Sequence, residues 1–162
     1  MCGIVAVTGY KKALPLLMNG LEKLEYRGYD SAGIAVINSE TNSITCNKAE
    51  GELKNLIGNL NGQKIPGTVG IGHTRWATHG KPEFKNAHPH VDGSGTIAVV
   101  QNGIIENFQD LKNKLEKEGI IFNSETDTEV IPHLIKRELN TLSKLNLENN
   151  GCLLYTSPSP RD

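Results

Sequence analysis

Short apolar runs separated by glycines and polar turns place the tightest constraint on how this chain can fold. The runs with the length and apolar content of strands cover residues 2–8, 33–37, 43–49, 68–74 and 96–102, with a shorter one, IIFN, at 120–123. Segments with helical periodicity lie between them. Because strands alternate with hairpin turns and with a few helices, the sequence predicts a mixed α/β fold.

Apolar residues recur at three- and four-residue spacing in the segments expected to be helices. These segments cover residues 11–26, a short stretch within 51–60, residues 106–118, and a last one that starts near 124 and ends near 142. Pro15 is expected in the first turn of its helix, and Pro132 fits only if it lies in or just beyond the first turn of its own. Gly119 has the position of a C-cap.

Composition excludes several classes of protein. The 162 residues are enough for one domain with a sizeable core, or for part of a larger one, and the formal net charge is only −1. No long single-sign charge run exists, so neither nucleic acid nor an anionic membrane is an expected partner. The apolar runs are too short to cross a bilayer, and no signal peptide is recognisable. Three scattered cysteines without a CxxC pair predict a reducing cytoplasm rather than a disulfide framework.

The first three residues, Met1-Cys2-Gly3, carry the elements of an N-terminal nucleophile. If Met1 is removed, Cys2 carries both a thiol and a free α-amine, which exchange protons near neutral pH. An N-terminal amine that activates an adjacent nucleophile is an established catalytic device. The alternative is that Cys2 is a small buried hydrophobe at the start of a strand.

The loop after residue 74 is polar and rich in histidine. With the end of the strand before it, this loop contains His73, Arg75, Trp76, His79, His88 and His90. His88-x-His90 suggests a metal site, but no third ligand has a characteristic spacing, so neither a metal nor another cofactor is expected. A Cys–His pair with Cys2 stays open. In a third interpretation, Arg75 binds a carboxylate and Trp76 forms an apolar wall. Ordinary loop polarity also explains each histidine taken alone.

Two further positions have a simple structural explanation and a functional one. Asn102-Gly103 follows an expected strand and is most often just a turn, but a side-chain amide beside an unhindered N–H is also what an oxyanion hole requires. Asp127 has the position of a helix N-cap. Its alternative role is a carboxylate that pairs with a substrate ammonium group.

Six motifs, taken together, resemble those of one enzyme family. They are MCGIV at the N-terminus, YRGYDSAG (26–33), HTRWATHG (73–80), NAHPH (86–90), QNGIIEN (101–107) and SETDTEV (124–130). In this order they resemble the N-terminal class II glutamine amidotransferase domain of the isomerising glutamine–fructose-6-phosphate aminotransferases. The phosphoribosyl pyrophosphate amidotransferases share only some of these motifs.

The resemblance implies a role for each matching residue. Cys2 would attack the side-chain amide of L-glutamine, while Asn102 and the N–H of Gly103 hold the oxyanion. Arg75 would bind the α-carboxylate of glutamine, and Asp127 its α-ammonium. Trp76, Thr78, His79 and Gly103 would line the substrate pocket, whereas Arg27 and His88 would be structural or gating positions.

The same resemblance implies an N-terminal nucleophile hydrolase fold, in which two antiparallel sheets lie between helical layers. Residues 2–142 would form a partial glutaminase domain whose sandwich is incomplete at its C-terminus. Residues 143–162 match nothing expected of the domain and have the character of a non-native tail. The sugar isomerase domains of the family are absent from the sequence.

The expected activity is hydrolysis of glutamine to glutamate and ammonia through a Cys2 thioester. In the family this half-reaction supplies ammonia for glucosamine 6-phosphate synthesis from fructose 6-phosphate, which the missing isomerase domains bind, and the full-length enzyme is expected to be a cytoplasmic homodimer. The alternatives are the glutaminase domain of another class II amidotransferase and an inactive fragment.

Overall fold

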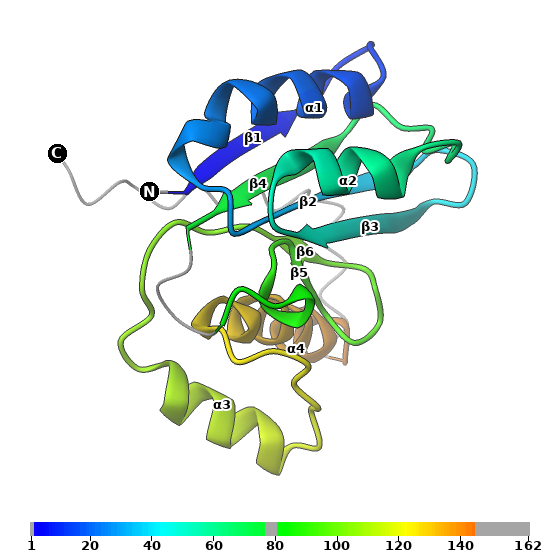
Figure 1. The fold of residues 1–162 in the computed structure, drawn as a ribbon. Helices are drawn as coiled ribbons and strands as arrows, with labels where there is room; N and C mark the ends of the chain where they lie inside the picture. Colours follow the sequence, from blue (N-terminus) through cyan, green and yellow to red (C-terminus); the bar gives the residue numbers. More distant parts are fainter. Residues whose placement is uncertain (1, 77–80, 145–162) are drawn as a thin grey trace, which may run out of the picture.

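A computed structural model describes residues 2–76 and 81–144. Its strands are β1 (Gly3–Val7), β2 (Ser31–Asn38), β3 (Ser43–Glu50), β4 (Gly70–Arg75), β5 (His90–Val91) and β6 (Ala98–Val99). Its α-helices are α1 (Ala13–Leu24), α2 (Leu53–Leu60), α3 (Phe108–Lys117) and α4 (Val130–Lys144), and 3₁₀ turns cover Glu25–Arg27, Phe84–Asn86 and Asp127–Glu129 (Figure 1).

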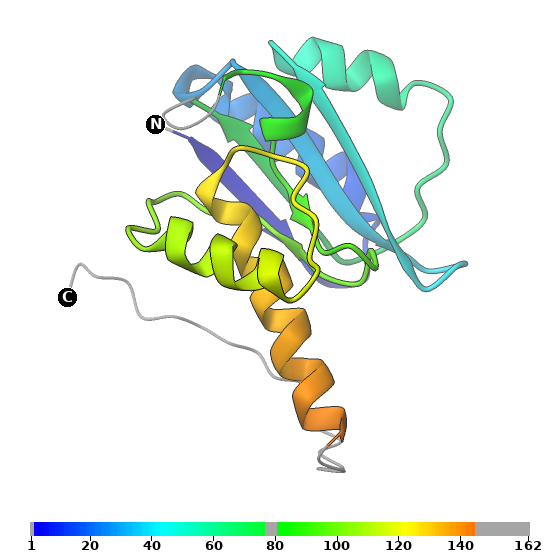
Figure 2. The same ribbon diagram turned by 90° about the horizontal axis from the view of Figure 1, so that it is seen from below.

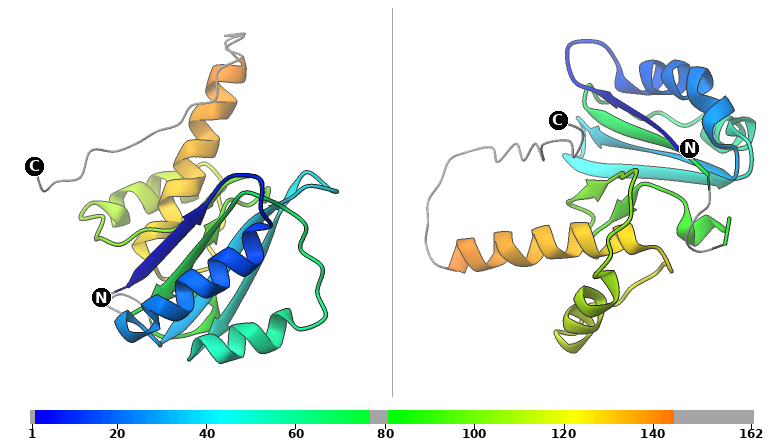
Figure 3. Two further views of the ribbon diagram at one scale, coloured as in Figure 1. Left: turned by 90° about the horizontal axis from the view of Figure 1, so that it is seen from above. Right: turned by 90° about the vertical axis from the view of Figure 1, so that its left-hand side faces the viewer.

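The main sheet is antiparallel throughout, with the strand order β1-β4-β2-β3. A second sheet within the described residues pairs β5 with β6, also antiparallel. Helices α1 and α2 cover the outer face of the main sheet, and the β5–β6 pair lies on the opposite face with α4 beyond it (Figure 3). The predicted sandwich of two antiparallel sheets between helical layers is therefore confirmed.

The largest apolar core lies between the main sheet and the helices α1 and α2. Leu17 and Leu21 of α1 are fully buried, as is Ile34 of β2. Full burial of a leucine or isoleucine side chain contributes about 1.5–3 kcal/mol. Gly70 and Gly72 of β4 let α1 approach closely, since added Cβ atoms would lie 2.9 Å from Leu17 and 3.0 Å from Leu21.

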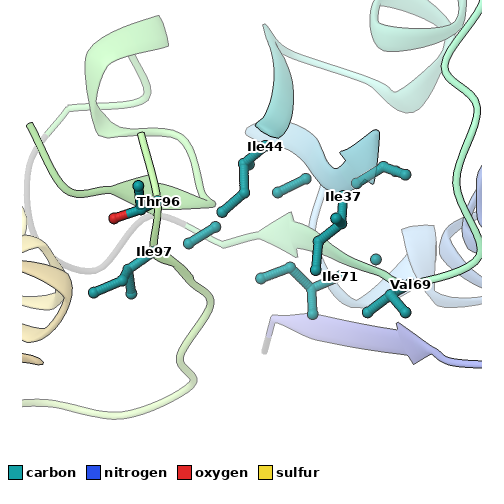
Figure 4. Close-up of a pocket in the computed structure, with 10 residues that line it drawn as sticks. Ile37, Ile44, Val69, Ile71, Thr96 and Ile97 are labelled. Atoms are coloured by element: carbon teal, nitrogen blue, oxygen red, sulfur yellow. The ribbon is translucent and has the colours of Figure 1, made fainter. Parts of the chain in front are cut away.

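The inner face of the main sheet changes character along β4. Side chains alternate between the two faces of a strand, so Ile71, His73 and Arg75 share the face opposite α1. At the Ile71 end, an apolar groove of about 310 Å³ separates this face from β6 (Figure 4). At the Arg75 end the same face is polar and deeply buried.

Part of this inner face is open to solvent. Ile4 and Ile37 are 39% and 44% exposed, and Val69 beside β4 is 40% exposed. The C-terminal part of α4 extends past both sheets, where Leu139 is also exposed (Figure 2). No helix in the described residues is long and apolar enough to span a membrane.

Several predicted elements differ from the observed ones. The strand expected over 96–102 is reduced to Ala98–Val99, because only His90–Val91 pairs with it in the described part of the chain. The strand expected at 120–123 is absent, since no ladder partner lies beside it within that same part. The helix expected from about 124 begins with a 3₁₀ turn at Asp127, and α4 itself starts at Val130.

Other local predictions are confirmed. Pro15 and Pro132 are both the third residue of their helices, where the missing N–H costs no hydrogen bond. Gly119 has a φ of +87° and ends α3. Its N–H bonds the carbonyl of Glu116, and the N–H of Ile120 bonds that of Leu115, which is the Schellman pattern.

Candidate active site

Cys2 lies at the start of β1, directly beside the end of β4. The register pairs Gly3 with Thr74, which brings Cys2 next to Arg75 and Trp76 on the neighbouring antiparallel strand. The N–H of Trp76 donates to the Cys2 Sγ at 3.2 Å, and the Trp76 carbonyl oxygen lies 3.5 Å from the same sulfur. The thiol is half-buried and forms no disulfide within the described part of the chain.

Asn102 and Gly103 lie in the segment after β6 and reach the same place. The Asn102 Nδ2 donates to the Cys2 carbonyl oxygen at 3.0 Å, which leaves its second hydrogen for another acceptor. The Asn102 Oδ1 lies 2.9 Å from the Nε2 of His73. Gly103 is exposed and has no side chain to cover its N–H.

Arg75 is only 4% exposed, although it carries a charge. Its Nη1 donates to the carbonyl oxygen of Lys81 at 3.3 Å. Burial lowers the pKa of Arg75 from its ordinary value, and the charges of Cys2, Asp30 and Asp127 act in the opposite direction. A guanidinium remains protonated in proteins, so the site contains a buried cation near the thiol.

Asp127 is 5% exposed and is not a helix N-cap, so that interpretation is wrong. Its Oδ2 accepts the N–H of Ile105 at 2.7 Å, and its Oδ1 lies 3.4 Å from the hydroxyl of Thr128. The carboxylate therefore ties the segment after Asn102-Gly103 to the start of α4. Asp127 also lies within electrostatic range of Arg75.

Trp76 is 45% exposed, and its ring meets that of Tyr29 edge to face with centroids 5.6 Å apart. Thr78 and His79, which were also predicted to line the pocket, lie outside the described residues.

Three of the histidines are not solvated, in contrast to what loop polarity predicts. His73, His88 and His90 are buried. The rings of His73 and His88 stack with centroids 4.3 Å apart, and those of His88 and His90 meet edge to face with centroids 4.6 Å apart. Burial is the main cause that lowers the pKa of His73 to about 4 and that of His90 to about 3, and it lowers the pKa of His88 as well. All three rings are thus neutral at pH 7.

Beyond the stack, sequence reasoning missed a second buried polar group of residues. The Nε2 of His90 lies 2.8 Å from the Thr126 hydroxyl, which in turn lies 2.8 Å from that of Ser124. The hydroxyl of Ser124 donates to Glu129. Burial opposes ionisation of Glu129, but the nearby His133, whose Nε2 lies 3.7 Å from its Oε1, and hydrogen bonds from Asn123 and Ser124 lower its pKa to about 2. Because a buried carboxylate and its hydroxyl partners look like ordinary helix-start residues, no local signal distinguishes them.

Among the described residues, no group of three or more His, Cys, Asp or Glu side chains is arranged to hold a metal ion. The arrangement instead offers a thiol, amide donors, a buried cation and a buried carboxylate around one point. A zwitterionic substrate with an amide group matches this set of charges and donors.

Comparison with known proteins identifies the family that this chain resembles. Residues 41–146 match the model of the glutamine amidotransferase domain family. The chain is 60% identical over 136 residues to glutamine–fructose-6-phosphate aminotransferase (isomerising) of Gloeobacter violaceus, covering 83% of this chain and 22% of that protein. The Clostridium perfringens protein of the same name is 59% identical over 135 residues, with the same two shares of coverage.

Two solved structures are similar in fold. One is the glutamine phosphoribosylpyrophosphate amidotransferase of B. subtilis complexed with ADP and GMP, with a TM-score of 0.69 and 33% identity. The other is described as the allosteric regulatory enzyme of purine biosynthesis, with a TM-score of 0.72 and 34% identity. The alignments cover 85% of this chain and 29% and 30% of those chains.

The chain spans about a fifth (22%) of the length of the curated relatives that it matches. The family match extends over more than half of the chain, and the sandwich fold agrees with it. The chain therefore belongs to the glutamine amidotransferase domain family.

Proposed function

We propose that this chain hydrolyses L-glutamine to glutamate and ammonia through a thioester on Cys2. The observation that carries most weight is the convergence of four segments on one point. The Cys2 thiol lies immediately before β1, and the buried Arg75 lies at the end of β4. The Asn102 amide lies in the segment after β6, and the buried Asp127 lies in the 3₁₀ turn before α4.

The charges around the thiol support glutamine as the substrate. The Arg75 guanidinium would bind the α-carboxylate, and the Asp127 carboxylate would bind the α-ammonium. Because both charges must be matched, a peptide amide would bind poorly. Trp76, together with Thr78 and His79 if they line the pocket as the resemblance implies, would exclude water from the bound amide.

The reaction begins once Met1 has been removed. The free α-amine of Cys2 would take the thiol proton as Sγ attacks the amide carbon, and the C–N bond would break after the amine returns a proton to the leaving nitrogen. Asn102 and the Gly103 N–H would stabilise the tetrahedral oxyanion, for which one donor is worth about 2.7–4 kcal/mol. Water would then hydrolyse the thioester to glutamate and regenerate the thiol.

We assign this hydrolysis to the ammonia-donating half of glucosamine 6-phosphate synthesis. The curated relatives are 59–60% identical and are named for fructose 6-phosphate, whereas the phosphoribosylpyrophosphate enzyme is 33% identical. Fructose 6-phosphate would bind to isomerase domains outside this chain, and the complete cytoplasmic enzyme would be a homodimer. The chain alone would make only glutamate and ammonia.

Residues 2–142 would then be a glutaminase domain in part, and residues 143–162 would not belong to it. The exposed apolar side chains on the inner face of the main sheet support this division, because in a complete sandwich they would be covered. Further strands of the domain are the natural cover for that face.

The experiment combines intact mass with glutamine hydrolysis. A purified chain that has lost Met1 should release glutamate, and Cys2→Ala should abolish the release. Cys46→Ala is the matched control, since Cys46 is also a free, half-buried cysteine of the main sheet but lies on β3. Full activity of the Cys2→Ala variant would refute the mechanism. Activity of a chain that retains Met1 would refute the role of the α-amine.

A further inference from the structure

We propose that His73 is a positioning residue, whose Nε2–H donates to the Oδ1 of Asn102 and so holds the donor end of that amide toward Cys2. The catalytic consequence rests on the proposed glutamine hydrolysis, whereas the hydrogen bond itself does not. His73 would touch neither the substrate nor the thiol.

The side-chain amide of Asn102 needs such a partner because its two ends are nearly alike in shape. One end is an acceptor oxygen and the other an NH₂ donor, and a flip exchanges them. If the oxygen faced the nucleophile, it would repel the developing oxyanion instead of stabilising it. Oxyanion stabilisation depends on donors that are held in place before the reaction.

The contacts identify His73 as the group that prevents this flip. Its Nε2 lies 2.9 Å from the Asn102 Oδ1, while the Asn102 Nδ2 donates to the Cys2 carbonyl oxygen at 3.0 Å. Asn102 is exposed and lies outside any strand, so these two bonds determine how its amide is oriented. Within the described residues, only the bond to His73 engages the oxygen end.

The same contact identifies the tautomer of His73. The Asn102 Oδ1 can only accept a hydrogen bond, so the Nε2 must carry the hydrogen. In a neutral ring the Nδ1 is then unprotonated, and no donor or acceptor within the described part of the chain is bonded to that nitrogen. Burial lowers the pKa of His73 to about 4, against the hydrogen bond to Asn102 and the nearby backbone of Gln101, so the ring is neutral at working pH.

The His73 ring is held rigidly enough to serve this purpose. The residue is fully buried, and its backbone pairs with Ile4 of β1 on one side and Gly33 of β2 on the other. The ring stacks on that of His88 at an interplanar angle of 25°. A rigid sheet residue thus orients a side chain on an otherwise irregular segment.

The first test compares two substitutions at this position. In His73→Gln the side-chain NH₂ can reach the place of Nε2, whereas in His73→Asn it cannot. We expect His73→Asn to lower kcat for glutamine by about 10²–10³-fold, as the loss of one oxyanion donor does, with little change in KM. His73→Gln should recover most of kcat. His133→Asn, which also replaces a buried histidine but has no contact with Asn102, should retain it.

Alkylation of Cys2 by iodoacetamide separates positioning from general damage. This substitution reaction forms no oxyanion, so its rate in folded His73→Asn should equal that of the unmodified sequence. An unchanged kcat in His73→Asn would overturn the inference. An alkylation rate that falls together with kcat would also overturn it, since the defect would then lie in the nucleophile.

A spectroscopic readout does not depend on activity or on variants. In ¹⁵N NMR of the histidine rings, the His73 signal should show the Nε2–H tautomer and should not titrate between pH 5 and 8. An Nδ1–H tautomer would exclude donation to Asn102 and would refute the inference even if the variants failed to fold. If the chain does not hydrolyse glutamine at all, the proposed function fails, and the tautomer still decides whether the hydrogen bond exists.

Discussion

At the scale of single residues, the buried Asp127 shows how one side chain can both stabilise the fold and bind a substrate. Asp127 accepts a backbone N–H from Ile105 through one oxygen, and the other oxygen lies near Thr128. A carboxylate is acceptor-only when ionised, with lone pairs left over after one such bond. The same side chain can therefore hold the loop and attract a cation.

Asp127→Asn should separate these two roles. The variant keeps an acceptor for the Ile105 N–H but loses the negative charge, so the fold should persist while KM for glutamine rises. A hydrogen bond to a charged group is worth about 1.5–3 kcal/mol, which corresponds to roughly 10- to 150-fold in KM. Steady-state kinetics measures the effect, and Asp110→Asn on the exposed face of α3 is the control. An unchanged KM would remove Asp127 from the substrate site.

The close approach of β2 to the loop before β5 shows how one element positions another. Gly33 lies in the middle of β2 and opposes His73 and Lys48 on the neighbouring strands. A Cβ added at Gly33 would overlap the carbonyl oxygen of His88. The absence of a side chain at this position lets the histidine loop lie flat against the main sheet.

Gly33→Ala should therefore destabilise the protein severely, because the atom that it meets belongs to the backbone and cannot move aside. We expect a loss of roughly 3–5 kcal/mol in the free energy of unfolding, at the upper end for point substitutions. Urea denaturation followed by circular dichroism measures it.

Gly58→Ala is the matched control for the change at Gly33. Gly58 lies inside α2, and a Cβ there would meet nothing within 4 Å. This variant should gain about 0.5–1 kcal/mol through helix propensity. Equal stability of the two variants would mean that the loop readily moves away from β2.

The buried histidines between the two sheets make the stability of the whole molecule depend on pH. His73, His88 and His90 are neutral in the folded protein, and they are faced by the charges of Lys48, Arg75 and Glu129. Unfolded histidines bind protons near pH 6.5, but the folded rings do so only at about 4 for His73 and about 3 for His90. Below pH 6.5 the unfolded chain thus holds more protons than the folded one.

The free energy of unfolding should consequently fall as the pH drops from about 6.5 to 4, by about 1.4 kcal/mol per pH unit for each such histidine. Below pH 4.5, Glu129 binds a proton in the unfolded chain, whereas its folded pKa is about 2. This difference lowers the free energy of unfolding further as the pH drops. Urea midpoints between pH 7 and 4 measure the slope. His90→Gln should reduce this slope by the contribution of one proton. A free energy of unfolding that does not change with pH would contradict the burial of neutral histidines.

The partly open sandwich leads to a second prediction for the whole molecule. The exposed Ile4, Ile37 and Val69 make an apolar surface on the inner face of the main sheet. A longer chain that carries the further strands proposed above should cover this surface, melt at a higher temperature and bind less of the dye ANS. Equal melting temperatures and equal dye binding would show that the described sandwich needs no further cover.

The sequence by itself determined the type and order of most elements and the residues around Cys2. Periodicity, glycines and prolines are local signals, and they predicted α1, α2 and the strands of the main sheet. The Asn102-Gly103 pair was recognisable because a side-chain amide beside an unhindered N–H is what an oxyanion hole requires. The pairing in the second sheet was not recognisable from the sequence. How much of the apolar run at 96–102 forms a strand depends on which segment lies beside it.

Only the tertiary structure decided what the buried polar residues do. From the sequence, Asp127 is interpreted as a helix cap, and the polarity of a loop explains the histidines His73, His88 and His90. The structure shows instead that Asp127 is not a cap and that the three rings pack together between the strands. Burial and the choice of hydrogen-bond partner depend on residues distant in sequence, and these set both the charge of a histidine and the orientation of the Asn102 amide. The motifs specify which groups are present, and the packing of the two sheets determines their protonation and direction.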